Sequence, residues 1–534
     1  MNSRFDYEIK KAASPAMAGV SAREVKCLLD EWERENVNIH SLIIIRQGII
    51  GCELYKEPLT SRDVHMLYSV SKSVLSAAFG FAVDEGYLSE STTFYDIFPE
   101  YCKIDDKYLM ELKLIDLLAM RSGKRFSVLK KPEADWLEYF VNGYWEFQPG
   151  TDFRYVSENS FVVAAAIVRA TGMSLTEFLK PRLYAPLGIE APFWETSPDN
   201  IEAGGWGIQL TPMDFAKFTL CCHNNGAFNG RQVIPAWWIK KATSFVSETK
   251  GSQRHRDSQA GYGYGFWRCA GADNSFRCEG LYSQYGISLK NSDACIVITA
   301  GAADLQKTLD VLWRHSDKLF IKKGMTGEDV ELCLTPSPRA VVSERQETTE
   351  AKLDGKLYRM RRRYFLNRIG FPVSSLPMPA LHFAKTPGGN MQSLRFSFDR
   401  QACTFSWSED GGFHNEIRAS MDGSDIRSRI VIGEMSFDVI AYARWLKKDK
   451  LELYIRPLSC VAARRFEFTF KKNKIYMYPD VVPTLTENAR VIGEKVKCVL
   501  PGLYFRTWVD ILVPRVTKIL QPIHKGRMIS PTNN

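Results

Sequence analysis

A serine followed three positions later by a lysine occurs three times in this chain, as Ser69/Lys72, Ser127/Lys130 and Ser247/Lys250. A serine can carry out acyl transfer when a neighbouring base takes its proton and fixed N–H groups hold the oxyanion. Lysine can be that base where apolar surroundings disfavour its charged form. The spacing alone does not choose among the three pairs, so the choice depends on the elements around them.

Only Ser69 stands at the start of a long apolar helix. Apolar side chains recur at helical spacing over residues 70–83, and Gly86 is typical of a helix end. The first N–H groups of a helix have no partner inside it, and a lysine three residues beyond the serine lies on the same face. The alternative is that Ser69 only caps the helix and Lys72 is exposed in its first turn.

The segments around this helix predict one α+β domain. Residues 21–35 have a capping serine and helical spacing, and residues 40–55 predict a hairpin with its turn at Gln47 and Gly48. A mostly helical stretch follows. Strand-like runs return between residues 261 and 301, before a last helix. We therefore expect strands from both ends of the segment to form one antiparallel sheet flanked by helices, with an all-helical insert.

The chain is long enough for two or more domains. It has 534 residues, of which 45% are hydrophobic, and its 70 basic and 61 acidic residues give a formal net charge of +9. Its start lacks the apolar segment of a signal peptide, and no stretch reaches the ~18 uninterrupted apolar residues of a membrane span. The twelve cysteines show no Cys-x-x-Cys spacing, which favours reduced thiols. We expect a cytoplasmic protein with no membrane partner.

A second domain is predicted after the first, which spans residues 1–334. Residues 335–350 are polar, contain proline and serine and have no apolar period, so they predict a linker. Short alternating runs between residues 351 and 483 predict an antiparallel, all-β domain of sandwich or barrel type. The C-terminal tail, residues 484–534, is mixed in character.

Several stretches in the first domain resemble the serine hydrolases related to the β-lactamases. This family includes class C β-lactamases, DD-peptidases, esterases and 6-aminohexanoate-dimer hydrolases. The resemblance covers about residues 15–320, in the family's order, and is carried by "HMLYSVSKSVLSAAFGFAVDEGYLS", "LIDLLAMRSG", "PGTDFRYVSENSFVVAAAIVRATG" and "EAGGWGIQLTPMDFAKF". It implies a β-lactamase/transpeptidase-like sheet with flanking helices. The C-terminal domain is similar to the β-rich appendages of some members.

The resemblance also implies roles for individual residues. Ser69 aligns with the family's nucleophile, Lys72 with its lysine, and Tyr155 with the tyrosine of the second motif. That phenol can relay a proton between the lysine, the serine and the leaving group. The Ser69 N–H should form half of the oxyanion hole, and the other half should come from the last strands near Ser283 or Gln284.

The chain departs from the family at two motifs that contact substrate. Ser157 stands where the second motif usually carries asparagine, and Leu281-Tyr282-Ser283 replaces the usual Lys-Thr-Gly or His-x-Gly. The second change removes the cation that would bind a substrate carboxylate. We therefore expect Ser157, Tyr282, Ser283 and Gln284 to contact an ester or a linear amide rather than a β-lactam.

No metal or organic cofactor is implied. Cys221, Cys222 and His223 have no second pair of ligands at zinc spacing. His65 lies four residues before Ser69, and we interpret it as a structural hydrogen-bonding residue rather than a second base.

The leading hypothesis is a serine hydrolase that acts on a small-molecule ester or amide, and a homodimer through the C-terminal domain is possible. One alternative is a catalytically weak binding or regulatory homologue on the same penicillin-recognising scaffold, which the altered third motif suggests. Another is a nucleic-acid binder that uses the basic run at 359–364, although a solvated surface is the simpler interpretation and we expect no nucleic-acid partner.

Overall fold

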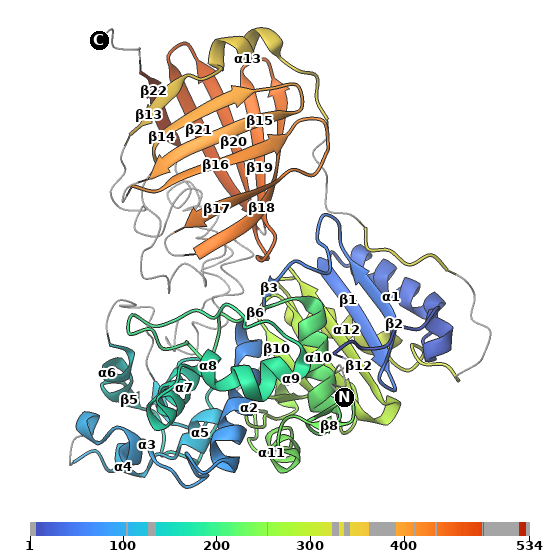
Figure 1. Cartoon of the computed structure of the whole chain (residues 1–534), viewed down its shortest axis with the longest axis vertical. Helices are drawn as coiled ribbons and strands as arrows, with labels where there is room; N and C mark the ends of the chain where they lie inside the picture. The colour runs from blue at the N-terminus through green and yellow to red at the C-terminus, as the bar shows by residue number, and fades with distance from the viewer. Residues whose placement is uncertain are drawn as a thin grey trace, which may run out of the picture. The chain divides into compact units, whose positions relative to one another are not determined.

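The computed structural model divides the chain into two compact units, one up to Thr335 and the other after it (Figure 1). The structure describes residues 7–102, 105–125, 135–251, 253, 255–322, 330–335, 342–361, 391–409, 412–432, 435–482, 484 and 523–529.

A six-stranded antiparallel sheet forms the centre of the first unit. Its order is β2 (Ile49–Tyr55), β1 (Ile39–Arg46), β12 (Ala294–Ala300), β11 (Gln284–Leu289), β10 (Phe276–Gly280) and β9 (Trp267–Arg268). Two strands come from the start of the unit and four from its end, as predicted. β12 is buried throughout and β1 almost throughout, which explains their nearly continuous apolar sequences.

Helices cover both faces of this sheet. On one face, α1 (Ala22–Arg34) packs against α12 (Leu305–His315) over an apolar core that includes Leu42, Ile287 and Ile296. On the other face, α10 (Pro212–His223) contacts β1, β11 and β12. The Ser21 hydroxyl accepts a hydrogen bond from the Glu24 N–H and caps α1, as its sequence predicts.

The helical part of the unit surrounds α2 (Ser71–Asp84) (Figure 1). α2 is buried from Ser71 to Ala82 and packs against α7 (Asn159–Thr171) and α11 (Ala236–Ala242). Gly80 lets the Trp238 ring approach, since a Cβ there would lie 2.2 Å from that ring. A helix enclosed in this way can be apolar on every side, which is the pattern of its sequence.

Short elements complete the first unit. The helices are α3 (Phe94–Ile97), α4 (Lys107–Glu111), α5 (Leu114–Leu118), α6 (Trp136–Val141), α8 (Leu175–Leu179) and α9 (Ala185–Leu187). The paired short strands are β3 (His65–Met66) with β6 (Gln209–Leu210), β4 (Lys124–Arg125) with β5 (Tyr144–Trp145), and β7 (Ala227–Phe228) with β8 (Arg231–Gln232).

The second unit is a ten-stranded sheet that closes on itself, because β16 also pairs with β18. Aromatic side chains such as Phe396, Phe405 and Phe468 pack together in its core. Its order is β16 (His414–Ser420), β15 (Ala402–Glu409), β14 (Met391–Phe398), β13 (Leu357–Met360), β22 (His524–Met528), β21 (Lys474–Val482), β20 (Ala463–Lys471), β19 (Lys450–Pro457), β18 (Met435–Lys447) and β17 (Arg427–Ile432). The predicted fold class, a β-lactamase-like α+β domain followed by an all-β domain, is confirmed.

Two boundaries of the second unit differ from the expectation. The last part of the predicted linker, residues 335–350, begins helix α13 (Glu347–Leu353), where Glu350 accepts hydrogen bonds from Arg345 and Trp445. The predicted tail, 484–534, contains β22, which pairs with β13 and β21. Residues 336–341 and 485–522 lie outside the described residues.

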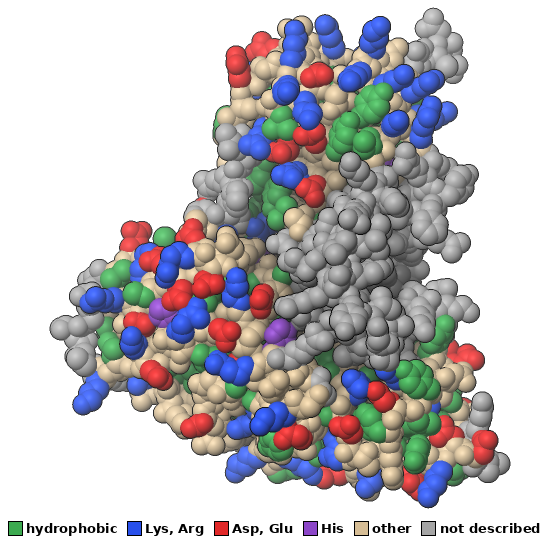
Figure 2. Space-filling model, turned by 180° about the vertical axis from the view of Figure 1, so that it is seen from behind, with side chains coloured by type: hydrophobic (Ala, Val, Ile, Leu, Met, Phe, Trp, Pro, Cys, Tyr) green, Lys and Arg blue, Asp and Glu red, His purple; other side chains and the backbone are tan. Residues whose placement is uncertain are grey.

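Charges of both signs alternate over the first unit on the face shown in Figure 2. Many form ion pairs, such as Arg182 with Glu85 and Arg314 with Glu31. Of the basic run at 359–364, the structure describes 359–361. Among the described residues no single helix is long and apolar enough to cross a membrane, and one bent pair, Asn159–Thr171 with Leu175–Leu187, meets that criterion by length and composition only when both are counted together.

Candidate active site

Ser69 lies in a 3-10 turn, Tyr68–Val70, that leads directly into α2. It is 9% exposed, so its hydroxyl is nearly enclosed. Tyr68, just before it, has φ +50°, a left-handed conformation that a bulky residue adopts only when its surroundings enforce it. The predicted helix at residues 70–83 is present, with this turn at its front.

Lys72 connects three oxygen atoms at the start of α2. Its side chain is 2% exposed, and its Nζ lies 3.0 Å from Ser69 Oγ, 3.2 Å from Ser157 Oγ and 2.7 Å from the Gly205 carbonyl oxygen. An ammonium group can donate to all three. A neutral amine can donate to two and accept the Ser69 proton. The geometry therefore permits proton exchange between Ser69 and Lys72.

Tyr155 lies on the other side of the same polar group. Its ring, 8% exposed, stacks on Trp267 with centroids 5.5 Å apart, and Lys72 Nζ lies 4.9 Å from its centroid. Burial raises the pKa of Tyr155 well above its usual range, and a hydrogen bond with Ser69 acts in the opposite direction. The phenol therefore keeps its proton at neutral pH.

The turn between β10 and β11 carries Tyr282 and Ser283, and Gln284 begins β11; all three residues are buried. Ser283 Oγ lies 2.8 Å from Thr308 Oγ1, and the Gln284 amide bonds the Leu281, Tyr282 and Ala300 backbone. These two side chains hold the turn in place. Their contact with substrate stays a prediction.

This turn lies next to the Ser69 turn. A Cβ on Gly280 would be 2.1 Å from the Leu67 carbonyl oxygen, and the rings of Tyr68 and Tyr282 have centroids 5.4 Å apart. Tyr282 and Ser283 have φ +60° and +68°, so a left-handed residue occurs in both turns. Backbone held in such a conformation is typical of functional sites.

Two residues at this site were not predicted. The Gly205 carbonyl is the nearest acceptor of Lys72, and a Cβ on Gly205 would lie 2.4 Å from the Ser157 carbonyl oxygen. Ser71, which lies between Ser69 and Lys72, hydrogen-bonds the Tyr68 carbonyl and the Ile208 N–H. Each of these hydrogen bonds involves a backbone group, which leaves no side-chain signal in a sequence.

Of the other two serine–lysine pairs, Ser247/Lys250 lies in the part of the chain that the structure describes. Ser127 and Lys130 lie outside the described residues. Ser247 donates to the Ala119 carbonyl oxygen at 2.9 Å, and Lys250 is exposed.

His65 is part of a buried chain of hydrogen bonds. Its Nδ1 lies 3.0 Å from the Met66 carbonyl oxygen, its Nε2 lies 2.9 Å from His40 Nδ1, and His40 Nε2 lies 3.1 Å from Asn38 Nδ2. We assign the proton of each imidazole to Nδ1, since every group in the chain then has a complementary partner. His65 Nε2 is thereby occupied as an acceptor, in agreement with the structural role predicted for it.

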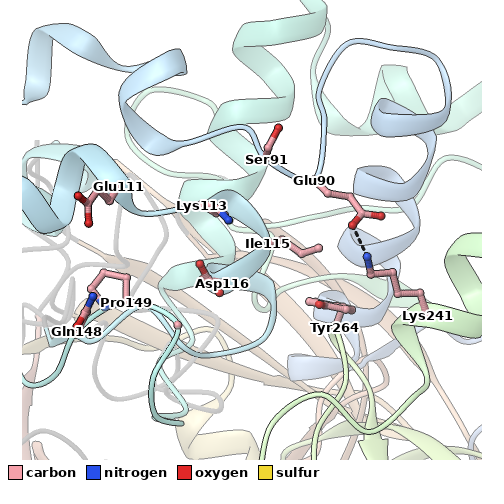
Figure 3. Close-up of a pocket in the computed structure, with 11 residues that line it drawn as sticks. Glu90, Ser91, Glu111, Lys113, Ile115, Asp116, Gln148, Pro149, Lys241 and Tyr264 are labelled. Carbon is pink, nitrogen blue, oxygen red and sulfur yellow. Dashed lines mark hydrogen bonds and ion pairs between the residues drawn. The ribbon is translucent and has the colours of Figure 1, made fainter.

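A pocket of about 600 Å³ lies elsewhere in the first unit (Figure 3). Glu90 and Lys241 form an ion pair at one side of it, and burial raises the pKa of Asp116 in its wall. Its lining carries charges of both signs and includes no predicted site residue. Among the described residues, no group of three or more His, Cys, Asp or Glu side chains is arranged to hold a metal ion.

The family follows from comparison with known proteins. The Beta-lactamase family model matches residues 42–314, more than half of the chain. The chain therefore belongs to the β-lactamase family, whose members have a serine hydrolase fold.

Characterised relatives are distant. A 6-aminohexanoate-dimer hydrolase of Paenarthrobacter ureafaciens is 22% identical over 289 residues, which cover 48% of this chain and 72% of that protein. A lovastatin esterase of Penicillium rubens is 26% identical over 30% of this chain and 46% of its own length. A β-lactamase of Escherichia coli is 26% identical over 29% of this chain and 41% of its own length.

Solved structures are also similar to this chain at low sequence identity. A family VIII carboxylesterase has 16% identity and a TM-score of 0.45, over 59% of this chain and all of that one. An octameric penicillin-binding protein homologue from Pyrococcus abyssi has 12% identity and a TM-score of 0.46, over 85% of this chain and 97% of that one.

Proposed function

We propose that this protein is a serine hydrolase that cleaves an ester or a linear amide through an acyl-enzyme on Ser69. The observation that carries the proposal is the contact of a buried lysine with a serine at a helix start, Lys72 Nζ to Ser69 Oγ at 3.0 Å, beside the protonated phenol of Tyr155. Nucleophile and base within hydrogen-bond reach are the minimum requirement for acyl transfer.

In the first half of the reaction, Ser69 Oγ attacks the substrate carbonyl carbon while its proton passes to neutral Lys72. The carbonyl oxygen becomes an oxyanion, held by the Ser69 N–H and a backbone N–H of the 282–284 turn. The intermediate then expels the alcohol or amine, which takes a proton from the Tyr155 phenol. Lys72 returns that proton to the phenol, which leaves an ester on Ser69 and both groups as they began.

In the second half, water replaces the leaving group. It loses a proton to Lys72 as it attacks the ester carbonyl, and Ser69 leaves with a proton as the acid is released. Hydrogen bonds from Lys72 to Ser157 and Gly205 keep the amine in place through both halves.

The substrate class follows from the third motif. Leu281, Tyr282 and Ser283 include no cation to bind the carboxylate of a β-lactam or a D-alanyl peptide. An ester or a linear amide does not require one. The presence of an esterase and a 6-aminohexanoate-dimer hydrolase among the relatives is compatible with this assignment.

A fluorophosphonate probe tests the proposal, because it reacts only with activated serines. We expect stoichiometric labelling of the wild-type protein, with the added mass on the peptide that contains Ser69. A panel of p-nitrophenyl esters, aminohexanoate dimers, nitrocefin and D-alanyl peptides then tests the substrate class. Absence of labelling would favour the weakly catalytic binding homologue, and preferred turnover of nitrocefin would overturn the ester or amide assignment.

Tyr155→Phe should lower kcat for an alkyl ester by about 10²-fold, because the alkoxide leaving group loses its proton donor while Lys72 remains. KM should change little, since the ring still stacks on Trp267. Tyr262→Phe is the matched control, because Tyr262 lies in the same aromatic cluster. Equal kcat values for the two variants would contradict a relay role for Tyr155.

A further inference from the structure

Ser71, which lies between Ser69 and Lys72, is not used by the proposed reaction. We propose that Ser71 is a positioning residue whose hydroxyl orients the Tyr68–Ser69 peptide, and with it the oxyanion-binding N–H of Ser69. This inference rests on the proposed function, because it concerns how fast Ser69 is acylated.

The Ser71 hydroxyl is fully buried and hydrogen-bonded on both sides. It donates to the Tyr68 carbonyl oxygen at 2.7 Å and accepts from the Ile208 N–H at 3.2 Å. Ile208 is 137 positions further along the chain. One hydroxyl therefore ties the turn before α2 to a distant loop.

The bond to Tyr68 acts directly on the oxyanion hole. The carbonyl of Tyr68 and the N–H of Ser69 belong to one planar peptide group and point in opposite directions. Fixing the carbonyl therefore fixes the direction of the N–H. The constraint matters here because Tyr68 is left-handed, at φ +50°, and depends on its contacts to stay so; the Ser71 hydroxyl adds to the bond that the Ser71 backbone N–H makes to the same carbonyl.

The bond to Ile208 acts on Lys72. The Ile208 carbonyl also accepts from the Leu67 N–H at 3.0 Å, so Ile208 is held by residues on both sides of the Ser69 turn. Three residues before Ile208, the Gly205 carbonyl accepts from Lys72 Nζ. Ser71 therefore fixes the position of the Ser69 turn relative to the Gly205 carbonyl, which accepts the hydrogen bond from Lys72.

This geometry predicts an effect on rate and not on binding. The oxyanion forms only as the serine attacks. A misdirected N–H therefore reduces the stabilisation of the transition state more than that of the initial complex. We expect Ser71→Ala to lower the maximal rate constant of fluorophosphonate inactivation, kinact, by about tenfold to hundredfold, with KI within about twofold of wild type.

Ser76→Ala is the matched control. Ser76 is equally buried, lies on the same helix, and has a hydroxyl with no hydrogen-bond partner among the described residues. Its kinact should equal that of wild type. Ser71→Thr keeps the hydroxyl and should recover most of the rate. All reactions are run well below the lowest melting temperature of the set, so that a loss of stability alone does not change kinact.

The outcomes separate this inference from the proposed function. If wild type is labelled on Ser69 and Ser71→Ala reacts within about twofold of wild type, the positioning role is wrong and the hydrolase proposal stands. A folded Ser71→Thr that is as slow as Ser71→Ala also contradicts the positioning role. If wild type is not labelled at all, the hydrolase proposal itself is wrong.

Discussion

Substituting alanine for Ser69 is expected to abolish covalent labelling and to lower kcat for any ester substrate by about 10⁴-fold or more. No other oxygen replaces the attacking atom, because Ser157 Oγ, which also contacts Lys72, lies in a separate loop after Tyr155. Stability should change little, since Lys72 keeps the Gly205 carbonyl and Ser157 as acceptors. The melting temperature should therefore stay near that of wild type while activity is lost.

The control for this experiment is the serine of another Ser-x-x-Lys pair. Ser247 is also buried, but its hydroxyl donates to the Ala119 carbonyl oxygen. Ser247→Ala should be labelled like wild type, with some loss of stability from the missing hydrogen bond. Labelling that persists in Ser69→Ala, or disappears in Ser247→Ala, would place the reactive serine elsewhere.

Much of the first unit could be predicted from local sequence because its elements begin and end with residues that favour those conformations. Ser21 caps α1, Gln47 and Gly48 take up the left-handed turn of the first hairpin, and Gly172 ends α7 at φ +70°. The tyrosine of the site could be predicted only through the family resemblance, since Tyr155 lies 83 positions after Lys72 in the sequence.

What could not be predicted depends on contacts made by backbone across the chain. Gly205 joins the site through its own carbonyl, and Ser71 joins it through the N–H of Ile208. No residue type marks such backbone partners in advance. β22 was missed because His524–Met528 lacks the apolar alternation of a strand. Its pairing with β13 and β21 imposes the conformation, and Gly526 fits where a Cβ would lie 2.6 Å from Met360 Sδ.

Replacing Lys72 by methionine should separate the stability of this site from its activity. Labelling should slow by about 10³-fold or more, because methionine cannot take the Ser69 proton. Stability should move by no more than about 2 kcal/mol, and an increase is the expected sign, since the three oxygen atoms within hydrogen-bond distance of Lys72 Nζ belong to uncharged groups.

Lys72→Arg supplies the complementary control. Arginine keeps the positive charge but does not become a neutral base in a protein. If Lys72 acts by accepting a proton, the methionine and arginine variants should be equally slow, measured by fluorophosphonate inactivation and thermal unfolding of the same samples. If Lys72 acts only through its charge, arginine should retain much of the wild-type rate while methionine does not. Fast labelling of both variants would show that Ser69 is activated by another group, which Tyr155→Phe would then identify.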